Sequence, residues 1–150
     1  RGLELLTAAL SADPDAREAA TLHRAIGLCH ERQRRYARAS REHAFASQLL
    51  IGLDPDLSTE LRVRAADDLF RAEMIEAAAE EYRLIFGLES VPDELRSWSA
   101  FQLGNCYFRN RRYTKAAAMY ESLRSAHQTS FWSEQAEARL AAIFRSGAAG

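Results

Sequence analysis

Apolar residues along the chain recur at the spacing of amphipathic helices, and they do not alternate with polar residues as they do in strands. Alanine, leucine, arginine and glutamate, which favour helices, are abundant between the breaks. The three prolines lie in short polar stretches, at Pro14, Pro55 and Pro92, where helices are expected to end or begin. The pattern predicts an all-α chain of long helices that are interrupted at regular intervals.

An internal repeat accounts for the regular intervals. Residues 24–46, 64–85 and 100–123 align with one another at six positions, and the first of these positions recurs at steps of 39 and 38 residues. The six positions hold Ile26, Ala65 and Leu103; Gly27, Ala66 and Gly104; His30, Leu69 and Tyr107; Tyr36, Ile75 and Tyr113; Ala39, Ala78 and Ala116; and His43, Tyr82 and Tyr120. The linkers repeat as well, because LDPDLSTELR recurs as LESVPDELR.

The third copy resembles the tetratricopeptide repeat (TPR) signature, in which an L-G-x-x-Y helix A precedes an A-x-x-x-F helix B. Leu103, Gly104 and Tyr107 match helix A, and Ala116 and Tyr120 match helix B. The small residues would let two helix backbones approach, and the aromatic rings would fill the gap between them. The resemblance implies an all-α, right-handed solenoid of antiparallel helix pairs with about three full repeats and flanking helices.

The resemblance also implies how the chain is divided. We expect a single domain over residues 1–150, in which the following segments are distinguished. The repeats are expected at about 16–53, 57–89 and 93–127, a partial repeat at 1–14 and a terminal helix at 131–146. Because the chain begins at Arg1 rather than at methionine, we expect it to be a fragment of a longer protein.

The repeats depart from the family pattern at the tryptophan position, at the closing proline, which is missing after the second and third repeats, and in their period. The usual tryptophan position holds His23, Arg62 and Ala100, and the period exceeds the common 34 residues. Repeats of this length look similar to those of bacterial envelope-associated TPR proteins. This similarity leaves the bacterial envelope or periplasm and the cytoplasm open as compartments.

The charge of the chain bears on its partners. A formal net charge of −1 disfavours general binding to nucleic acid or to a membrane surface, because both are polyanionic. No apolar run approaches the ~20 residues that a membrane span needs. Cys29 and Cys106 occupy the same position two repeats apart, so we expect both thiols to be free. We therefore expect a protein or peptide partner, no nucleic acid and no direct membrane insertion.

The sequence lacks the common motifs for catalysis. Phosphate-binding loops, dinucleotide fingerprints, zinc-protease motifs, paired-cysteine motifs and serine-nucleophile motifs are absent from the sequence. The adjacent carboxylates Asp67-Asp68 and Glu80-Glu81 splay apart on a helix, and we interpret them as solvated. The sequence therefore predicts no catalytic residue, no cofactor and no metal site, and the protein is not expected to be an enzyme.

Three histidines in the first repeat allow two interpretations. His23 and His30 share one helical face, and His43 occupies the inward position on helix B. Converging imidazoles could bind a metal ion. We favour packed core histidines, because Cys29 is turned ~100° away from His30 and no carboxylate ligand is obvious in the sequence.

Arginine triplets recur at the turn between helix A and helix B. RQRR (32–35) and RNRR (109–112) hold this place in the first and third repeats, whereas the second repeat has RAEM. The triplets could form a basic rim for an acidic partner or a phosphate. We favour solvated arginines that interact with helix C-termini, because the chain as a whole is nearly neutral.

Helix A of the third repeat carries a second apolar stripe beside its core face. In TPR arrays, helix-A residues outside the core set form the concave surface. On that resemblance, the predicted partner-binding residues are Arg24, Leu28, Val63, Asp67, Phe70, Trp98, Phe101, Asn105 and Phe108. The alternative is plain packing, in which neighbouring A helices or the terminal helix cover Phe101 and Phe108, with Trp98 the residue expected to stay partly exposed.

These observations predict a protein–protein interaction scaffold or adaptor that binds a peptide or protein segment on the helix-A face. Two alternatives stay open. In one, the module self-assembles into a homo-oligomer; in the other, it regulates a catalytic domain elsewhere in a larger chain.

Overall fold

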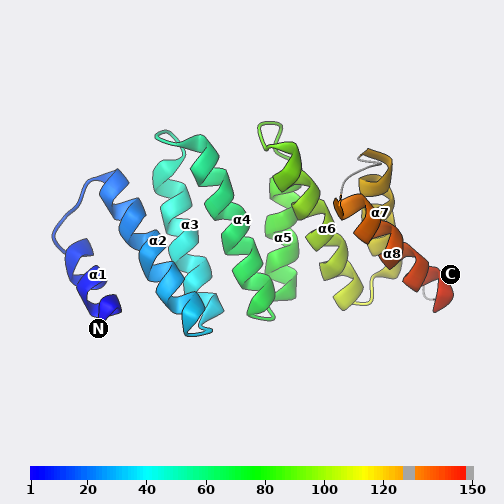
Figure 1. Ribbon diagram of the computed structural model, residues 1–150, viewed down its shortest axis with the longest axis horizontal. Helices are drawn as coiled ribbons and strands as arrows, with labels where there is room; N and C mark the ends of the chain where they lie inside the picture. Colours follow the sequence, from blue (N-terminus) through cyan, green and yellow to red (C-terminus); the bar gives the residue numbers. More distant parts are fainter. Residues whose placement is uncertain (127–130, 148–150) are drawn as a thin grey trace. The chain divides into compact units, whose positions relative to one another are not determined.

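The structure is a computed structural model that describes residues 1–126 and 131–147, and every regular element in these ranges is an α-helix (Figure 1). The predicted all-α class is therefore confirmed. In chain order the helices are α1 (Gly2–Leu10), α2 (Ala16–Arg32), α3 (Tyr36–Leu50), α4 (Pro55–Arg71), α5 (Ile75–Phe86), α6 (Asp93–Arg109), α7 (Tyr113–Ala126) and α8 (Phe131–Arg145).

The chain divides into two compact units. Unit 1 comprises residues 1–74 with α1 to α4, and unit 2 comprises residues 75–150 with α5 to α8. The division falls in the A–B turn of the second predicted repeat, so that its helix A belongs to unit 1 and its helix B to unit 2. The single domain expected over 1–150 stays a prediction.

The prolines lie at helix starts, as predicted. α4 begins at Pro55, and Asp54 caps it by accepting a hydrogen bond from the Leu57 amide at 3.2 Å. Proline suits this position because the first helical N–H has no partner within the helix. Asp15 caps α2 in the same way and forms a capping box with Glu18. The polar linkers of the sequence are therefore helix-capping segments.

The three A–B turns share one backbone geometry. Arg34, Glu73 and Arg111 have positive φ angles of 55°, 61° and 58°, and they recur at the steps of 39 and 38 residues seen in the alignment. Each turn also forms the same two hydrogen bonds: the amides of Arg34 and Arg35, for example, donate to the carbonyls of Glu31 and His30. This is the Schellman motif, which closes the end of a helix. The sequence repeat is thus also a repeat of local structure.

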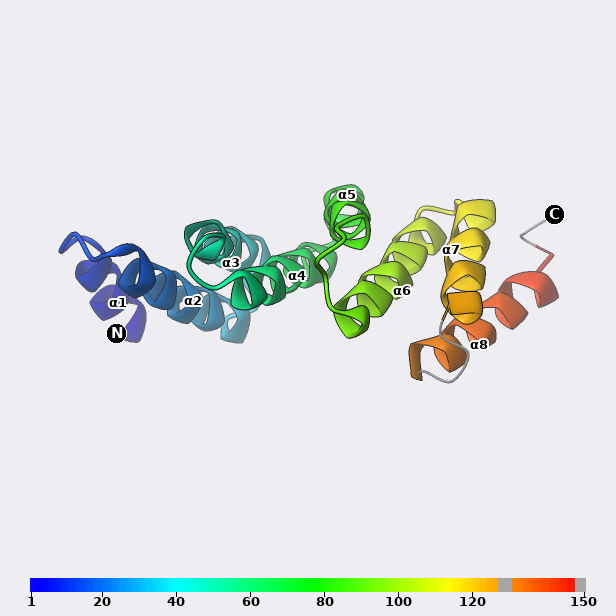
Figure 2. The ribbon, with the colours of Figure 1, turned by 90° about the horizontal axis from the view of Figure 1, so that it is seen from above.

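Unit 1 places α3 against both α2 and α4. Figures 1 and 2 together show α2 and α4 in one layer and α3 beside them in a second layer. Gly27 of α2 lies beneath the ring of His43, and a Cβ atom at Gly27 would lie only 2.5 Å from His43 Nε2. Unit 1 also contains a small apolar cluster formed by Ala20, Ala46, Leu50 and Leu61. His43 therefore fills the gap between the first A and B helices, as expected.

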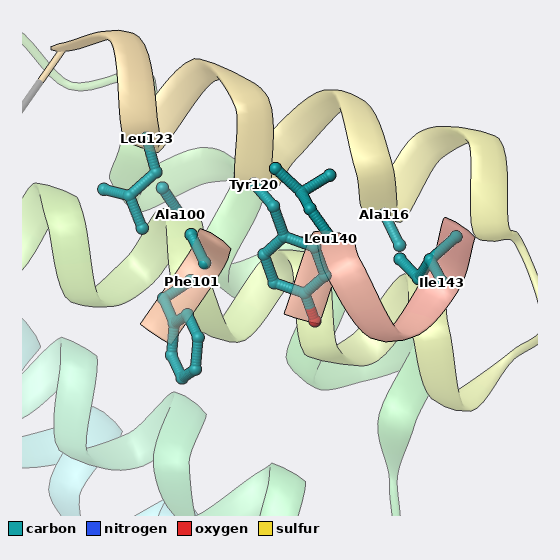
Figure 3. Close-up of a cluster of buried hydrophobic side chains, with 8 residues drawn as sticks. Ala100, Phe101, Ala116, Tyr120, Leu123, Leu140 and Ile143 are labelled. Atoms are coloured by element: carbon teal, nitrogen blue, oxygen red, sulfur yellow. The ribbon is translucent and has the colours of Figure 1, made fainter. Parts of the chain in front are cut away.

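Unit 2 packs α6, α7 and α8 around an apolar cluster (Figure 3). The ring of Tyr120 lies over Gly104, where an added Cβ would come within 2.6 Å of a ring carbon. The buried members of the cluster are Ala100, Phe101, Ala116, Tyr120, Leu123, Ala136, Leu140 and Ile143. The close approach of helices at a glycine, predicted from the TPR-like signature, is present in both units.

Both cysteines are free, as the sequence predicted. Cys106 is fully buried on α6, and burial raises the pKa of its thiol to about 12. A thiol kept protonated in this way is a packing group rather than a nucleophile.

Candidate functional site

The aromatic stripe on α6 meets the last helix. The ring centroid of Trp98 lies 4.6 Å from that of Trp132 on α8, and the Phe101 ring lies 5.3 Å from the same tryptophan. Phe101 is buried and belongs to the apolar cluster of unit 2, whereas Trp98 is half-buried. Helix α8 therefore covers this part of the stripe. Packing, the alternative that the sequence left open for Phe101, accounts for that residue, and Trp98 stays partly exposed as expected.

The remaining two stripe residues are also engaged within unit 2. Asn105 accepts a hydrogen bond from the Tyr120 hydroxyl at 2.5 Å and donates one to Gln102 at 2.7 Å. Burial raises the pKa of Tyr120, so that its hydroxyl keeps the proton it donates. The Phe108 ring meets Tyr113 of α7 edge to face at 5.3 Å. Asn105 thus links helix A to helix B, and its role in partner binding stays a prediction.

The predicted partner-binding residues of unit 1 range from exposed to buried. Arg24 is exposed, and Leu28 on the same helix is half-buried. On α4, Asp67 and Phe70 are half-buried, whereas Val63 is 4% exposed and contributes little surface. Accessible predicted residues are therefore present on α2 and α4, and Arg24 is the one that is fully exposed.

A network of hydrogen bonds and ion pairs joins the helices of unit 1. His43 and Asp68 are fully buried, and His43 Nδ1 lies 2.8 Å from Asp68 Oδ2. Glu31 of α2 approaches the same nitrogen at 3.8 Å, and both of its oxygens accept hydrogen bonds of 2.7 Å from Arg64. The hydrogen bond from Arg64 lowers the pKa of Glu31. The network ties α2, α3 and α4 together.

Asp68 is a correction to the sequence analysis, in which the Asp67-Asp68 pair was interpreted as solvated. Neighbouring residues on a helix point about 100° apart, so one can be buried while the other stays accessible. The repeat alignment contained a signal, because Asp68 occupies the position of the buried Cys106. A buried histidine also needs an acceptor for its ring N–H.

The network must also be considered as a metal site. Glu31, His43 and Asp68 offer ligand atoms that lie within 4.8 Å of one another. However, Arg64 already binds both oxygens of Glu31, and Arg71 lies 3.4 Å from Asp68. A cation would have to displace Arg64 and the proton that His43 shares with Asp68. The donor set therefore fits a charge-compensated hydrogen-bond network better than a metal centre.

The other two histidines lie in different surroundings. His23 Nδ1 is 2.6 Å from Glu42 Oε2, and its ring stacks on Phe45 with centroids 5.4 Å apart. His30 is buried, and burial lowers the pKa of its imidazole. Each histidine therefore has its own packing role, and the ligand set suggested by their spacing does not assemble.

Comparisons with protein-family models, with curated proteins and with solved structures produced no match. Within the described ranges, no helix combines the length and the apolar character needed to cross a bilayer.

Proposed function

We propose that the chain is a TPR-like, right-handed solenoid module that binds a protein or peptide segment and acts as a scaffold or adaptor rather than as an enzyme. The observation that carries this proposal is the A–B turn that recurs at Arg34, Glu73 and Arg111 at the spacing of the sequence repeat. A repeated helix pair presents equivalent faces side by side, and such faces are typical binding surfaces.

The helix-A residues of unit 1 are the best candidates for partner contact. Arg24 and Leu28 on α2 offer a charge and an apolar side chain, and Asp67 and Phe70 on α4 offer the same combination. The Glu31–Arg64 ion pair joins the two helices, so these groups are held on a stiff support. A binding surface prearranged in this way loses less conformational entropy on association. We infer that the site includes the helix-A face of the first and second predicted repeats.

The proposal can be tested without knowing the natural partner. Random peptides displayed on phage would be selected against the whole chain, and their affinities measured for variants. Arg24→Glu and Leu28→Ala should each weaken the selected peptides by about tenfold or more, as expected for central contacts. Arg41→Glu is the matched control, because Arg41 is an exposed arginine on α3. Peptides that depend on Arg41 but not on Arg24 would contradict the assignment of the face.

Self-assembly is a second candidate, favoured by exposed apolar side chains on the terminal helices. Leu5 of α1 and Phe131 and Phe144 of α8 are 69%, 60% and 65% exposed. The end repeats of soluble solenoids usually carry polar outer faces. Sedimentation of the whole chain at rising concentration should show association that Phe144→Glu weakens. A monomer at all concentrations would rule this candidate out.

A further inference from the structure

A basic cavity lies in unit 1 at the junction between the start of α3 and the end of α4. Its volume is about 520 Å³, and it is separate from the helix-A residues discussed above. The lining residues are Arg34, Arg35, Tyr36, Ala37, Arg38, Arg71, Ala72 and Glu73. Four of these side chains are guanidinium groups, and Glu73 is the only carboxylate among them. Such an excess of positive charge stands out in a chain whose formal net charge is −1.

Three of the arginines are not neutralised within unit 1. Among the described residues, no carboxylate forms an ion pair with Arg34, Arg35 or Arg38. Arg71 lies over the Tyr36 ring at 5.9 Å and reaches Asp68 at 3.4 Å. Guanidinium groups gathered around one cavity repel each other, and a bound anion would relieve this repulsion.

The first turn of α3 adds backbone donors to the same cavity. The N-cap of α3 is Arg35, whose side chain makes no capping hydrogen bond, and its first turn contains no acidic residue. By contrast, Asp15 and Asp54 cap α2 and α4. Because the N-terminus of a helix carries partial positive charge, an anion in the cavity would also interact with the helix dipole.

At the corresponding junction in unit 2, a carboxylate of the protein itself lies beside the basic side chain. There the start of α5 meets the end of α6, and Glu76 occupies the repeat position of Ala37. Asn110 donates a hydrogen bond of 3.0 Å to Glu76, and Arg112 lies 3.8 Å from the same carboxylate. The protein thus supplies an anion at this junction in unit 2, whereas Ala37 leaves the equivalent place in unit 1 open.

We propose that the unit 1 cavity binds the phosphate group of a phosphorylated ligand, either a small phosphate monoester or a phosphorylated side chain of a polypeptide. A phosphate monoester carries about −1.5 to −2 charges near pH 7 and three acceptor oxygens, which suits several arginines and helix amides together. The cavity is larger than a lone phosphate needs, and Tyr36, Ala37 and Ala72 provide a less polar wall for the group that carries it. The proposal stands independently of the helix-A peptide site.

The decisive variant is Ala37→Glu, which installs in unit 1 the carboxylate that Glu76 supplies in unit 2. Binding of O-phosphoserine, a phosphoserine peptide and the same peptide with glutamate would be measured by titration calorimetry on the whole chain. The unaltered chain should bind the phosphoserine peptide at least about tenfold more tightly than the glutamate peptide. Ala37→Glu should remove that preference without lowering the melting temperature, because glutamate is favourable in a first helical turn.

Two further measurements complete the test. Arg35→Ala should weaken binding of phosphoserine at least about fivefold, whereas Arg112→Ala, at the same repeat position in the third repeat, should leave it unchanged. Amide NMR signals of residues 36 and 37 should shift on titration. Equal binding of phosphoserine and the phosphopeptide would identify a small-molecule ligand, and binding of the peptide alone would identify a polypeptide ligand. The proposal is overturned if phosphorylated probes do not bind, or if their binding is insensitive to Ala37→Glu.

Discussion

In both units a glycine of one helix lies beneath a ring from the next helix, Gly27 beneath His43 and Gly104 beneath Tyr120. The side chains that surround the ring differ between the two units. His43 meets the carboxylate of Asp68 in a network that includes two arginines, whereas Tyr120 lies among apolar side chains and donates its hydroxyl proton to Asn105. One backbone arrangement thus supports an ionic core in unit 1 and an aromatic core in unit 2.

The comparison shows that helix pairs with the same geometry can be built from chemically different side chains. The close approach of two helices requires a small residue opposite a planar ring, and both imidazole and phenol rings meet that requirement. The polar atom on the ring then determines which side chains surround it, because a buried hydrogen-bond donor needs an acceptor. Unit 1 should therefore depend on charge and pH, and unit 2 on apolar burial.

The two units can be followed separately in solution. The two tryptophans of the chain, Trp98 and Trp132, both lie in unit 2. Tryptophan fluorescence therefore reports unfolding of unit 2, whereas far-UV circular dichroism reports helices of both units. A change confined to unit 1 should alter the dichroism curve and leave the fluorescence curve unchanged.

The largest difference in stability between the two units is expected for variants of Asp68 and Cys106, which occupy the same repeat position. Asp68→Ala should cost about 3–5 kcal/mol of the stability of unit 1, because it leaves His43 and its neighbours without their buried partner. Cys106→Ala should cost unit 2 only about 1 kcal/mol, since no charge loses a partner. Urea unfolding followed by both signals would measure the two values. Similar losses for the two variants would show that the unit 1 network contributes no more than ordinary packing.

The next largest loss of stability is expected for glycine-to-alanine variants, and it should be nearly equal in the two units. Gly27→Ala and Gly104→Ala each place a Cβ against a rigid ring, and such overpacking should cost about 1–3 kcal/mol. Gly52→Ala is the control, because a Cβ at Gly52 meets no atom within 4 Å. Thermal melts should therefore show lower midpoints for the first two variants and an unchanged midpoint for the control. A large loss in only one unit would mean that the two ring contacts are not equivalent.

The smallest expected effect is acid sensitivity of unit 1. The pKa of Glu31 is lowered from its ordinary 4.5 by Arg64, so its stabilising contribution is present above that value and is lost as the pH falls below it. Burial lowers the pKa of His30 from 6.5, so the folded chain favours the neutral imidazole. Protonation of His30 as the pH falls below 6.5 therefore also destabilises the fold. Because Arg64 is partly exposed, the Glu31 contribution should be below about 1 kcal/mol.

The measurement is a pair of urea curves at pH 7 and pH 4. The dichroism midpoint should fall more than the fluorescence midpoint, and Glu31→Gln should reduce that difference. If the tryptophan signal is lost first on acidification, the assignment of the ionic core to unit 1 is wrong.

Much of the local structure followed from the order of residues. The helices and their breaks could be predicted because periodicity, proline and capping aspartates act within a few residues of one another. The ring-over-glycine pairs were accessible too, since the repeat alignment matched Gly27 with Gly104 and His43 with Tyr120. The common A–B turn also has a local cause, because its hydrogen bonds join residues no more than five positions apart.

Three features depended on contacts between distant segments. Asp68 is buried because α3 brings His43 to it, and Phe101 is covered because α8 brings Trp132 to it. The arginine runs RQRR and RNRR are nearly identical, yet one borders an open basic cavity and the other is next to Glu76. By itself the sequence determined which residues form helices, turns and close helix pairs, because those interactions are short in range. Only the tertiary structure decided which face is covered and which charge is compensated, because the partner side chain arrives from another helix.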